Sequence, residues 1–143
     1  MDISDELLNK LSVETGLTDL RFNEEGVASF IFDEVHQTCL EKHPDTHTLI
    51  LWGKVGTLPF ANREACLIHL LQGNLFGKET GKASLGLEPM QEEIYLFQTF
   101  DLDTVTFELF FEELKRFLKT QKSWAEKVKN AFSSGDVSQK VWG

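Results

Sequence analysis

Residues of the types that bind metal ions cluster in one stretch of the sequence. They are His36, Cys39, His43, Asp45 and His47. On a helix the spacing of His36, Cys39, His43 and His47 would bring these four to one face, and imidazole and thiolate are ligands that zinc prefers. Pro44 interrupts such a helix, and on a strand His36 and Cys39 would point to opposite faces. The sequence therefore predicts no metal site, and these histidines are interpreted as surface residues.

The glycine-rich stretch from Gly73 to Glu79 resembles a phosphate-binding loop only in its glycines and Lys78. Its spacing is one residue short, and Glu79 stands where a Ser or Thr would hold magnesium. A helix is predicted before it, whereas a phosphate-binding loop follows a strand. We therefore expect neither a bound nucleotide nor any other cofactor.

No arrangement of side chains predicts catalysis. Cys39 and Cys66 lie outside any C-x-x-C motif, and no Ser, His and Asp have the spacing of a nucleophilic site. Adjacent acids are more typical of solvated surfaces and turns than of acid/base pairs. They are Glu24-Glu25, Glu92-Glu93 and Glu112-Glu113. The protein is therefore not expected to be an enzyme.

The net charge of −9 is concentrated at the N-terminal end of the sequence. Residues 1–45 contain eleven acids and three bases, residues 46–100 five acids and four bases, and residues 101–143 seven of each. An acidic surface repels nucleic-acid phosphates and anionic lipids, so neither is an expected partner. A basic or mixed polypeptide suits this charge better.

No targeting or membrane-spanning segment is predicted. Residues 1–15 are acidic and amphipathic, without the basic start and apolar run of a secretory signal. No stretch reaches the roughly 18 to 20 apolar residues that span a bilayer. Two cysteines provide no disulfide framework. We therefore expect a cytosolic protein with reduced thiols and no membrane insertion.

The strand expected to organise the fold is Thr48–Val55. Its apolar residues fall on both faces by period-two counting and only Lys54 is charged, which predicts an inner strand covered on both sides. Val27–Phe32 is a second predicted strand. Val35–Lys42 alternates poorly, but it lies between the two. Val27–Val55 is therefore predicted to be a three-stranded antiparallel meander.

Two helices are expected around this meander. The first has Ser4 as a suitable N-cap, Gly16 at its end, and one narrow apolar face formed by Ile3, Leu7, Leu8 and Leu11. The second runs from Arg63 to about Leu75, with Asn62 as its N-cap. Its apolar residues do not stay within one stripe, which favours burial against a partner subunit as well as against the sheet. An ordinary core helix remains the alternative.

The rest of the chain predicts a hairpin and a long helix. Ala83–Leu87 and Glu92–Leu102 alternate as strands joined through Pro89–Gln91. From Asp103, a suitable N-cap, apolar residues follow at spacings of three and four up to Phe132. Residues 133–143 are expected to be a flexible tail, with Trp142 as the residue that argues for a role there.

These elements predict one domain over residues 1–143 with a single core, because a chain of this length with twelve Phe can bury most of its apolar surface. The fold class is α+β. It is a twisted antiparallel five-stranded sheet with three helices, in the order helix, three strands, helix, two strands, helix.

Several stretches together match a family pattern, without one sharp motif. They are Leu20-Arg21-Phe22-Asn23-Glu24-Glu25-Gly26-Val27, Phe30-Ile31-Phe32-Asp33, Leu49-Ile50-Leu51 through Val55 to Leu58-Pro59, Leu70–Asn74, Gly81–Leu87, Ile94–Phe97 and Phe110–Trp124. With the predicted order of elements, residues 3–132 resemble the class I type III secretion chaperones, small acidic dimeric proteins that escort bacterial effectors to the injection apparatus. Where that family often has Cys after the glycine turn, this chain has Val27-Ala28.

The resemblance implies a homodimer in the bacterial cytoplasm. It would bind the N-terminal region of one or more effectors in extended, non-globular form and keep them soluble and competent for secretion. The secretion ATPase or sorting apparatus would be a further partner. The dimer contact would involve Ile68, Leu71, Leu75, Leu85 and Leu87. The effector would bind against Leu7, Leu8, Leu11, Phe22, Phe30 and Phe32.

Other interpretations remain open at this point. Phe30 and Phe32 are costly to leave exposed to water unless another chain covers them, but they suit a core beneath the first or third helix equally well. A dimeric peptide-binding adaptor or regulator of the same fold could act outside secretion. A small metal-dependent enzyme using the region from His36 to His47 is a third alternative.

Overall fold

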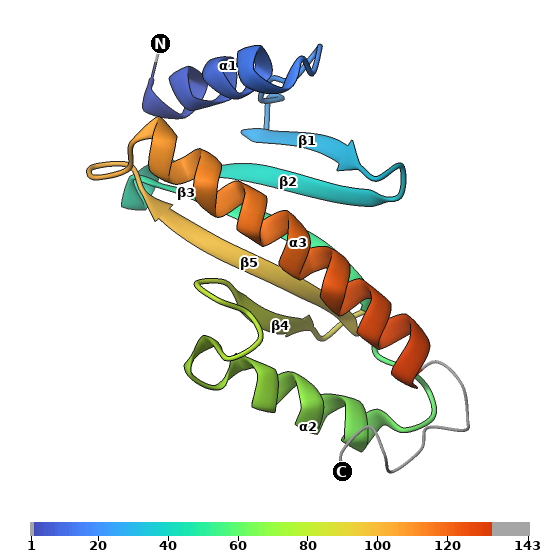
Figure 1. Ribbon diagram of the computed structural model, residues 1–143. Helices are drawn as coiled ribbons and strands as arrows, with labels where there is room; N and C mark the ends of the chain where they lie inside the picture. Colours follow the sequence, from blue (N-terminus) through green and yellow to red (C-terminus); the bar gives the residue numbers. More distant parts are fainter. Residues whose placement is uncertain (1, 133–143) are drawn as a thin grey trace. The chain divides into compact units, whose positions relative to one another are not determined.

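The computed structural model describes residues 2–132, which form three α-helices and five β-strands. The helices are α1 (Ile3–Thr15), α2 (Arg63–Asn74) and α3 (Phe107–Phe132), and the strands are β1 (Val27–Phe32), β2 (His36–His43), β3 (Thr48–Thr57), β4 (Ser84–Glu88) and β5 (Glu93–Asp101). The strands form one sheet in the order β1-β2-β3-β5-β4 (Figure 1). The predicted α+β fold and its order of elements are confirmed.

The described chain divides into two compact units. The first contains residues 2–53 and 98–118, and the second contains residues 54–97 and 119–132. The division passes through β3, β5 and α3. We describe each unit by itself, and the single domain over residues 1–143 stays a prediction. The predicted tail at 133–143, including Trp142, lies outside the described residues.

In the first unit, β1, β2 and β3 form the predicted antiparallel meander. Ala28 lies opposite Leu40, and Leu40 lies opposite Leu51. All three side chains are buried, so this face belongs to the core. On the other face of β3, Ile50 and Trp52 are only half-buried. The prediction that this strand is covered on both faces is therefore wrong for the second face.

The first helix, α1, begins at Asp2 and not at the predicted Ser4. The Asp2 carboxylate accepts the backbone N–H of Asp5 at 2.8 Å, which satisfies one of the free donors of the first turn. Ser4 lies inside that turn and is buried. At the other end Gly16 has a φ of 73°, so it closes the helix as predicted.

Lys42 of β2 ties α1 to the sheet. Its Nζ lies 3.1 Å from an Asp2 oxygen and 3.0 Å from an Asp5 oxygen, and 4.5 Å from the centre of the Phe22 ring. Burial lowers the pKa of Lys42, but the bonds to Asp5 and Asp2 outweigh it, so the pKa is raised. The pKa of Asp2 is lowered, first by the N–H of Asp5 and further by Lys42. Both charged forms are therefore favoured in the folded chain.

Removing this charge is expected to loosen α1 without unfolding the unit. Lys42→Met keeps the aliphatic stem but loses two partly exposed ion pairs, together worth about 1 kcal/mol. Because the folded pKa of Asp2 is lowered, its contribution is present above its ordinary pKa of 3.8 and is lost as the pH falls through the folded value. Hydrogen exchange should therefore show lower protection of α1 amides, relative to the intrinsic exchange rate at the same pH, in Lys42→Met at neutral pH and in the natural chain near pH 3. Unchanged α1 exchange in both cases would contradict this role.

The last helix, α3, is capped by a later residue than the predicted Asp103. Thr106 caps it, since its hydroxyl accepts the backbone N–H of Leu109 at 3.2 Å. Asp103, the predicted cap, lies in the preceding turn, where its carboxylate is 2.6 Å from the Nδ1 atom of His47. That ion pair holds Asp103 outside the helix. Within the first unit, α3 buries Phe110, Leu114 and Phe117.

In the second unit, Asn74 at the end of α2 binds β4 directly. Its side-chain amide donates to the Leu85 carbonyl at 2.9 Å, and its side-chain oxygen accepts the Leu85 N–H at 2.7 Å. One amide thus satisfies both backbone groups of a strand residue. These two hydrogen bonds join α2 to β4, and thereby to the hairpin of β4 and β5.

Trp124 of α3 is the centre of the second unit. Its indole N–H donates to the Glu79 carbonyl at 2.7 Å, and the Lys127 ammonium lies 4.6 Å from its ring centre. Lys127 also bonds the Glu79 carboxylate at 2.8 Å, which lowers the pKa of that group. Gly73 of α2 comes so close that a Cβ there would lie 2.8 Å from Cη2 of the indole. The absence of a side chain at Gly73 therefore allows α2 to pack on Trp124.

Candidate partner-binding surfaces

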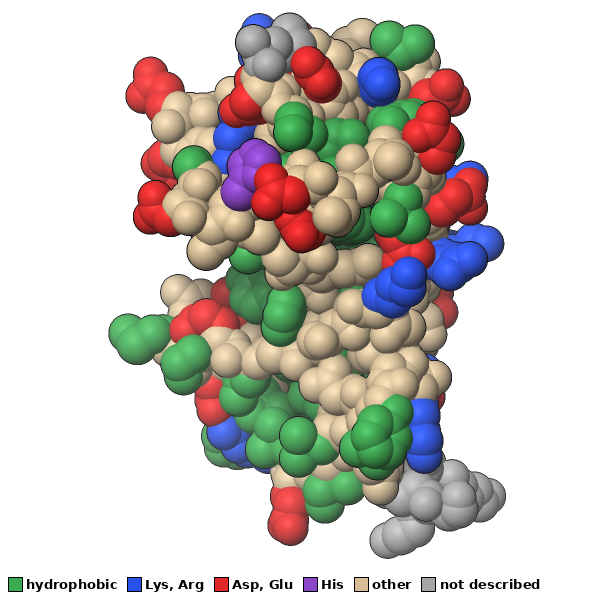
Figure 2. Space-filling model, turned by 90° about the vertical axis from the view of Figure 1, so that its left-hand side faces the viewer, with side chains coloured by type: hydrophobic (Ala, Val, Ile, Leu, Met, Phe, Trp, Pro, Cys, Tyr) green, Lys and Arg blue, Asp and Glu red, His purple; other side chains and the backbone are tan. Residues whose placement is uncertain are grey.

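The outer face of α2 exposes several large apolar side chains. Cys66, Leu70 and Gly73 point inward and are buried. The outward positions are 43% exposed at Ile68, 69% at Leu71 and 50% at Leu75, which exceeds what a helix on a solvated surface needs. Figure 2 shows hydrophobic side chains gathered in its lower part, over α2 and β4.

Four of the five residues predicted for a dimer contact are accessible in this way. Leu87 of β4 is 39% exposed, in addition to the three outward residues of α2. Leu85 is buried, because its backbone is bound by Asn74 and its side chain faces Leu96 of β5 in the core. Leu85 therefore offers no side-chain surface to a second chain. We call Ile68, Leu71, Leu75, Phe76 and Leu87 the α2 patch.

Phe76 belongs to this patch although the sequence did not single it out. It directly follows Leu75, its side chain is 91% exposed, and its backbone has a φ of 55°. A bulky residue in this left-handed region is strained, and an exposed aromatic ring gains nothing from its own fold. Such a residue is typical of a functional surface.

The residues predicted to bind an effector divide into two groups. Leu7, Leu8 and Leu11 of α1 are buried within the first unit, so they hold α1 to the sheet and offer no accessible surface. Phe22 and the β1 residues Phe30 and Phe32 are half-buried. Phe22 lies beneath the Lys42 ammonium.

Two further apolar residues near β1 are more accessible than any of the six. Ile31 is 61% exposed and Val35, in the turn after the strand, is 75% exposed. Ile31 alternates with Phe30 and Phe32 along the strand, so its side chain lies on the other face of the sheet. Period-two counting shows this alternation, but only the structure shows which face is uncovered.

The strand β1 also forms one edge of the sheet, and β4 forms the other (Figure 1). An edge strand has a row of backbone N–H and C=O groups without partners in its own sheet. Natural edges are commonly protected by charges or proline, but β1 consists of Val-Ala-Ser-Phe-Ile-Phe. Both backbone groups of Val27 are already bonded to Asn23, so the part of the edge suited to pair with another extended chain is residues 28–32.

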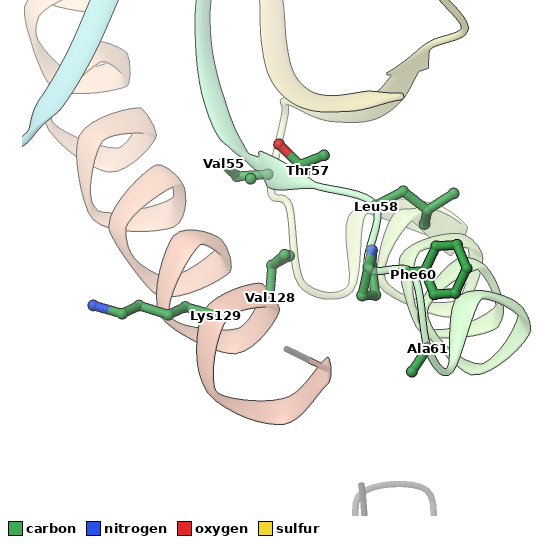
Figure 3. A pocket seen from close by; sticks show the side chains of 9 residues that line it. Val55, Thr57, Leu58, Phe60, Ala61, Val128 and Lys129 are labelled. Carbon is green, nitrogen blue, oxygen red and sulfur yellow. The ribbon is translucent and has the colours of Figure 1, made fainter. Parts of the chain in front are cut away.

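A pocket of about 540 Å³ lies in the second unit. No sequence pattern predicted it. Figure 3 shows Val55, Leu58 and Ala61 on one side and Val128 of α3 on the other. Phe60 at its rim is 97% exposed. The lining is mostly apolar, and Thr57 and Lys129 are its only residues with polar side chains.

The predicted scatter of the histidines agrees with their contacts. His43 lies 2.7 Å from Glu41, and His47 pairs with Asp103. Within residues 2–132, no three His, Cys, Asp or Glu side chains come together as a metal site would require. Burial raises the pKa of the Cys66 thiol to about 11 and also raises the pKa of Cys39, so neither thiol is an effective nucleophile at neutral pH.

Comparison with known proteins identifies the family. The family model described as the Tir chaperone protein (CesT) family matches residues 6–125. The chain belongs to this family. The Tir chaperone of Citrobacter freundii is 29% identical over 120 residues, which cover 84% of this chain and 76% of the relative. The resemblance to type III secretion chaperones that the sequence showed is confirmed by this match.

Solved structures agree with this fold. A chain in the crystal structure of the ExsC-ExsE complex has a TM-score of 0.74 at 23% identity, over 86% of this chain and 91% of that chain. A chain in the structure of the Yersinia pestis type III secretion chaperone SycH in complex with a stable fragment of YscM2 has a TM-score of 0.65 at 18% identity, over 84% and 98%. At these identities the likeness supports the fold.

Membership in the Tir chaperone protein (CesT) family makes this protein a chaperone and directs attention to its surfaces. Two surfaces bring together several exposed or half-buried apolar side chains: the α2 patch, and the β1 edge with Ile31 and its half-buried phenylalanines. Among the described helices, α3 is the longest, and none is both long and apolar enough to cross a membrane.

Proposed function

We propose that this protein is a homodimeric chaperone of the bacterial cytoplasm that binds the N-terminal segment of one or more secreted effectors. The segment would be held in extended, non-globular form, soluble and ready for secretion. The observation that carries the proposal is the β1 edge: a chaperone of this family has an unprotected sheet edge beside half-buried Phe30 and Phe32.

Strand addition at β1 would supply affinity through the backbone, and apolar side chains of the effector would contact Phe30, Phe32 and Ile31. Ordering an extended segment costs conformational entropy, so a single edge is a small site for it. A longer contact that continues toward Phe22 would offset this cost. Leu7, Leu8 and Leu11 would support that surface from below and would bind the effector only if α1 moved.

The α2 patch supports the homodimer. It combines Ile68 and Leu71 of α2 with Leu75 and Phe76 directly after the helix and Leu87 of β4, and an exposed apolar patch of this kind is typical of a protein interface. A two-fold dimer would bring the patch against its own copy, so each exposed leucine gains a partner. The patch belongs to the second unit and β1 to the first, so the two proposed surfaces share no residue.

The proposed activity is binding and requires no catalytic group and no cofactor. Raised thiol pKa values and paired histidines agree with this role. The chaperone would pass its effector to the secretion ATPase or sorting apparatus. An adaptor or regulator of the same fold that binds another target is the second candidate, and the identity of the bound protein separates the two.

The test is purification of the tagged full chain from its own host. A much larger protein should co-purify, and limited proteolysis should leave that protein's N-terminal segment bound. Ile31→Asp should lose the partner, because a charge at a 61% exposed edge position opposes apolar contact without disturbing the core. Leu8→Asp would instead test folding, since Leu8 is buried.

Val13→Asp is the matched control, because Val13 is 84% exposed but lies on α1. Circular dichroism should be unchanged in both variants. If Ile31→Asp retains the partner as well as Val13→Asp does, β1 is not the binding edge. A partner that is a DNA-bound or regulatory protein, with no secreted segment, would favour the adaptor.

A further inference from the structure

The edge strand β1 lies between two acidic turns. Before it, Glu24 and Glu25 occupy a turn in which the Asn23 side-chain oxygen accepts the backbone N–H groups of Glu25 at 2.9 Å and Val27 at 3.0 Å. After it, Asp33 and Glu34 form the turn into β2. All four acids are exposed, and the six strand residues between them are uncharged.

Three of the four acids in these turns are not paired with a base among the described residues of the same unit. Within residues 2–132, the side chains of Glu24, Glu25 and Glu34 make no ion pair. Lys42, on the neighbouring strand, is bound to Asp2 and Asp5. Both ends of the β1 edge therefore present net negative charge to any chain that pairs with it.

This pattern excludes several occupants of the edge. Pairing of β1 with the β1 of a second copy would bring acidic turns against acidic turns, whichever direction the strands ran, and like charges in such close pairs are destabilising. Nucleic acid and anionic lipid are repelled for the same reason. An uncharged extended segment would gain only the backbone pairing.

We propose that the segment paired with β1 has alternating apolar residues over the length of the strand and a Lys or Arg at each end. The proposal rests on the proposed function, and it adds the chemistry by which the edge selects its partner. Glu25 and Glu34 lie on either side of the six strand residues Val27–Phe32, and a strand rises about 3.3 Å per residue. The two basic residues of the partner should therefore lie about eight positions apart.

The acidic turns before and after β1 form one recognition surface together with the apolar residues of the strand. Ile31 on one face and Phe30 and Phe32 on the other provide apolar contact for alternate side chains of the added strand. The acidic turns then restrict which apolar segments remain bound. Because the charge is present at both ends, the pattern fits a parallel or an antiparallel partner strand.

Two fluorescein-labelled peptides test this selection on the full chain. Each has seven alternating Val and Thr residues, flanked by Lys at both ends in one peptide and by Glu in the other. Fluorescence anisotropy at low salt should show the Lys-flanked peptide binding on the order of tenfold more tightly, since two exposed ion pairs replace two repulsions. In the variant Glu25→Lys/Glu34→Lys each turn keeps one acid beside the new Lys, so its net charge is zero and the preference should be lost.

A charge-matched variant controls for the overall charge of the protein. Glu64 and Glu126 are exposed in the second unit, and neither makes an ion pair within the described residues. Glu64→Lys/Glu126→Lys should keep the preference for the Lys-flanked peptide. Equal affinity of the natural chain for both peptides, or a loss of the preference in this control as well, overturns the proposal.

The outcomes separate this inference from the proposed function. If neither peptide binds but the effector still co-purifies, the edge chemistry is wrong and the chaperone function stands. If the peptides bind with the expected preference but no effector co-purifies, the charge selection stands and the secretion role fails.

Discussion

Replacing Trp124 with alanine is expected to unfold the second unit. The indole is fully buried, and truncating a buried Trp typically costs about 3–5 kcal/mol. That is a large share of the roughly 5–15 kcal/mol that stabilises a domain. The variant also leaves the Glu79 carbonyl without the N–H that donates to it at 2.7 Å. Urea unfolding followed by circular dichroism should show a much lower midpoint or no cooperative transition.

Two further variants show which part of this loss comes from packing. Trp124→Phe keeps most of the volume but loses the N–H donor, so its effect should be clearly smaller than that of alanine. Gly73→Ala should destabilise the natural chain, because its Cβ would lie 2.8 Å from Cη2 of the indole. In the Trp124→Ala background the same change should cost much less. Costs that simply add would show that Gly73 and Trp124 do not act together.

Substituting Leu71 by aspartate is expected to convert the dimer to a monomer. Leu71 is 69% exposed at the centre of the α2 patch, so the folded chain tolerates a charge there. In a two-fold interface the substitution would place two carboxylates close together without water, which costs several kcal/mol. Light scattering at micromolar concentration should give twice the chain mass for the natural protein and the single mass for the variant.

Met90→Asp is the matched control for this experiment. Met90 is 88% exposed in the second unit, in the turn between β4 and β5 and outside the α2 patch. It should leave the dimer intact. A natural protein that is already monomeric at micromolar concentration would overturn the proposed dimer. A dimer that survives Leu71→Asp would place the contact elsewhere.

Phe76 offers a second measurement on the same patch. Phe76→Gly removes both the exposed ring and the strain of its φ of 55°, so the isolated chain should become more stable by roughly 0.5–1 kcal/mol. The dimer should become weaker at the same time. Stability and association that change in opposite directions are the signature of a residue retained for binding. If both increase together, the ring has no role in association.

The sequence predicted the elements well because hydrophobic periodicity reports which face of an element is apolar. The meander over Val27–Val55, the second helix from Arg63 and the hairpin through Pro89–Gln91 all form. The caps were harder to predict, since several residues near each start can accept an N–H. Asp2 and Thr106 therefore cap two helices in place of Ser4 and Asp103.

The candidate sites were predicted less completely, for a related reason. An apolar residue on a helix face has the same pattern whether it meets the sheet or another chain. Leu8 and Leu71 illustrate this, because both lie on apolar faces but one is 3% and the other 69% exposed. Phe76 carries no periodic signal at all, and its strained backbone is visible only in three dimensions.

The two hydrogen bonds between Asn74 and Leu85 affect the rate at which the proposed dimer would form. Because one amide joins helix and strand, most of the surface proposed for self-association is already assembled in the single chain. Two copies would then meet as rigid bodies, with little ordering left to do, at the ~10⁵–10⁷ M⁻¹ s⁻¹ usual for proteins. At micromolar concentration newly made chains would find each other within roughly seconds, before most of a long secreted protein had left the ribosome.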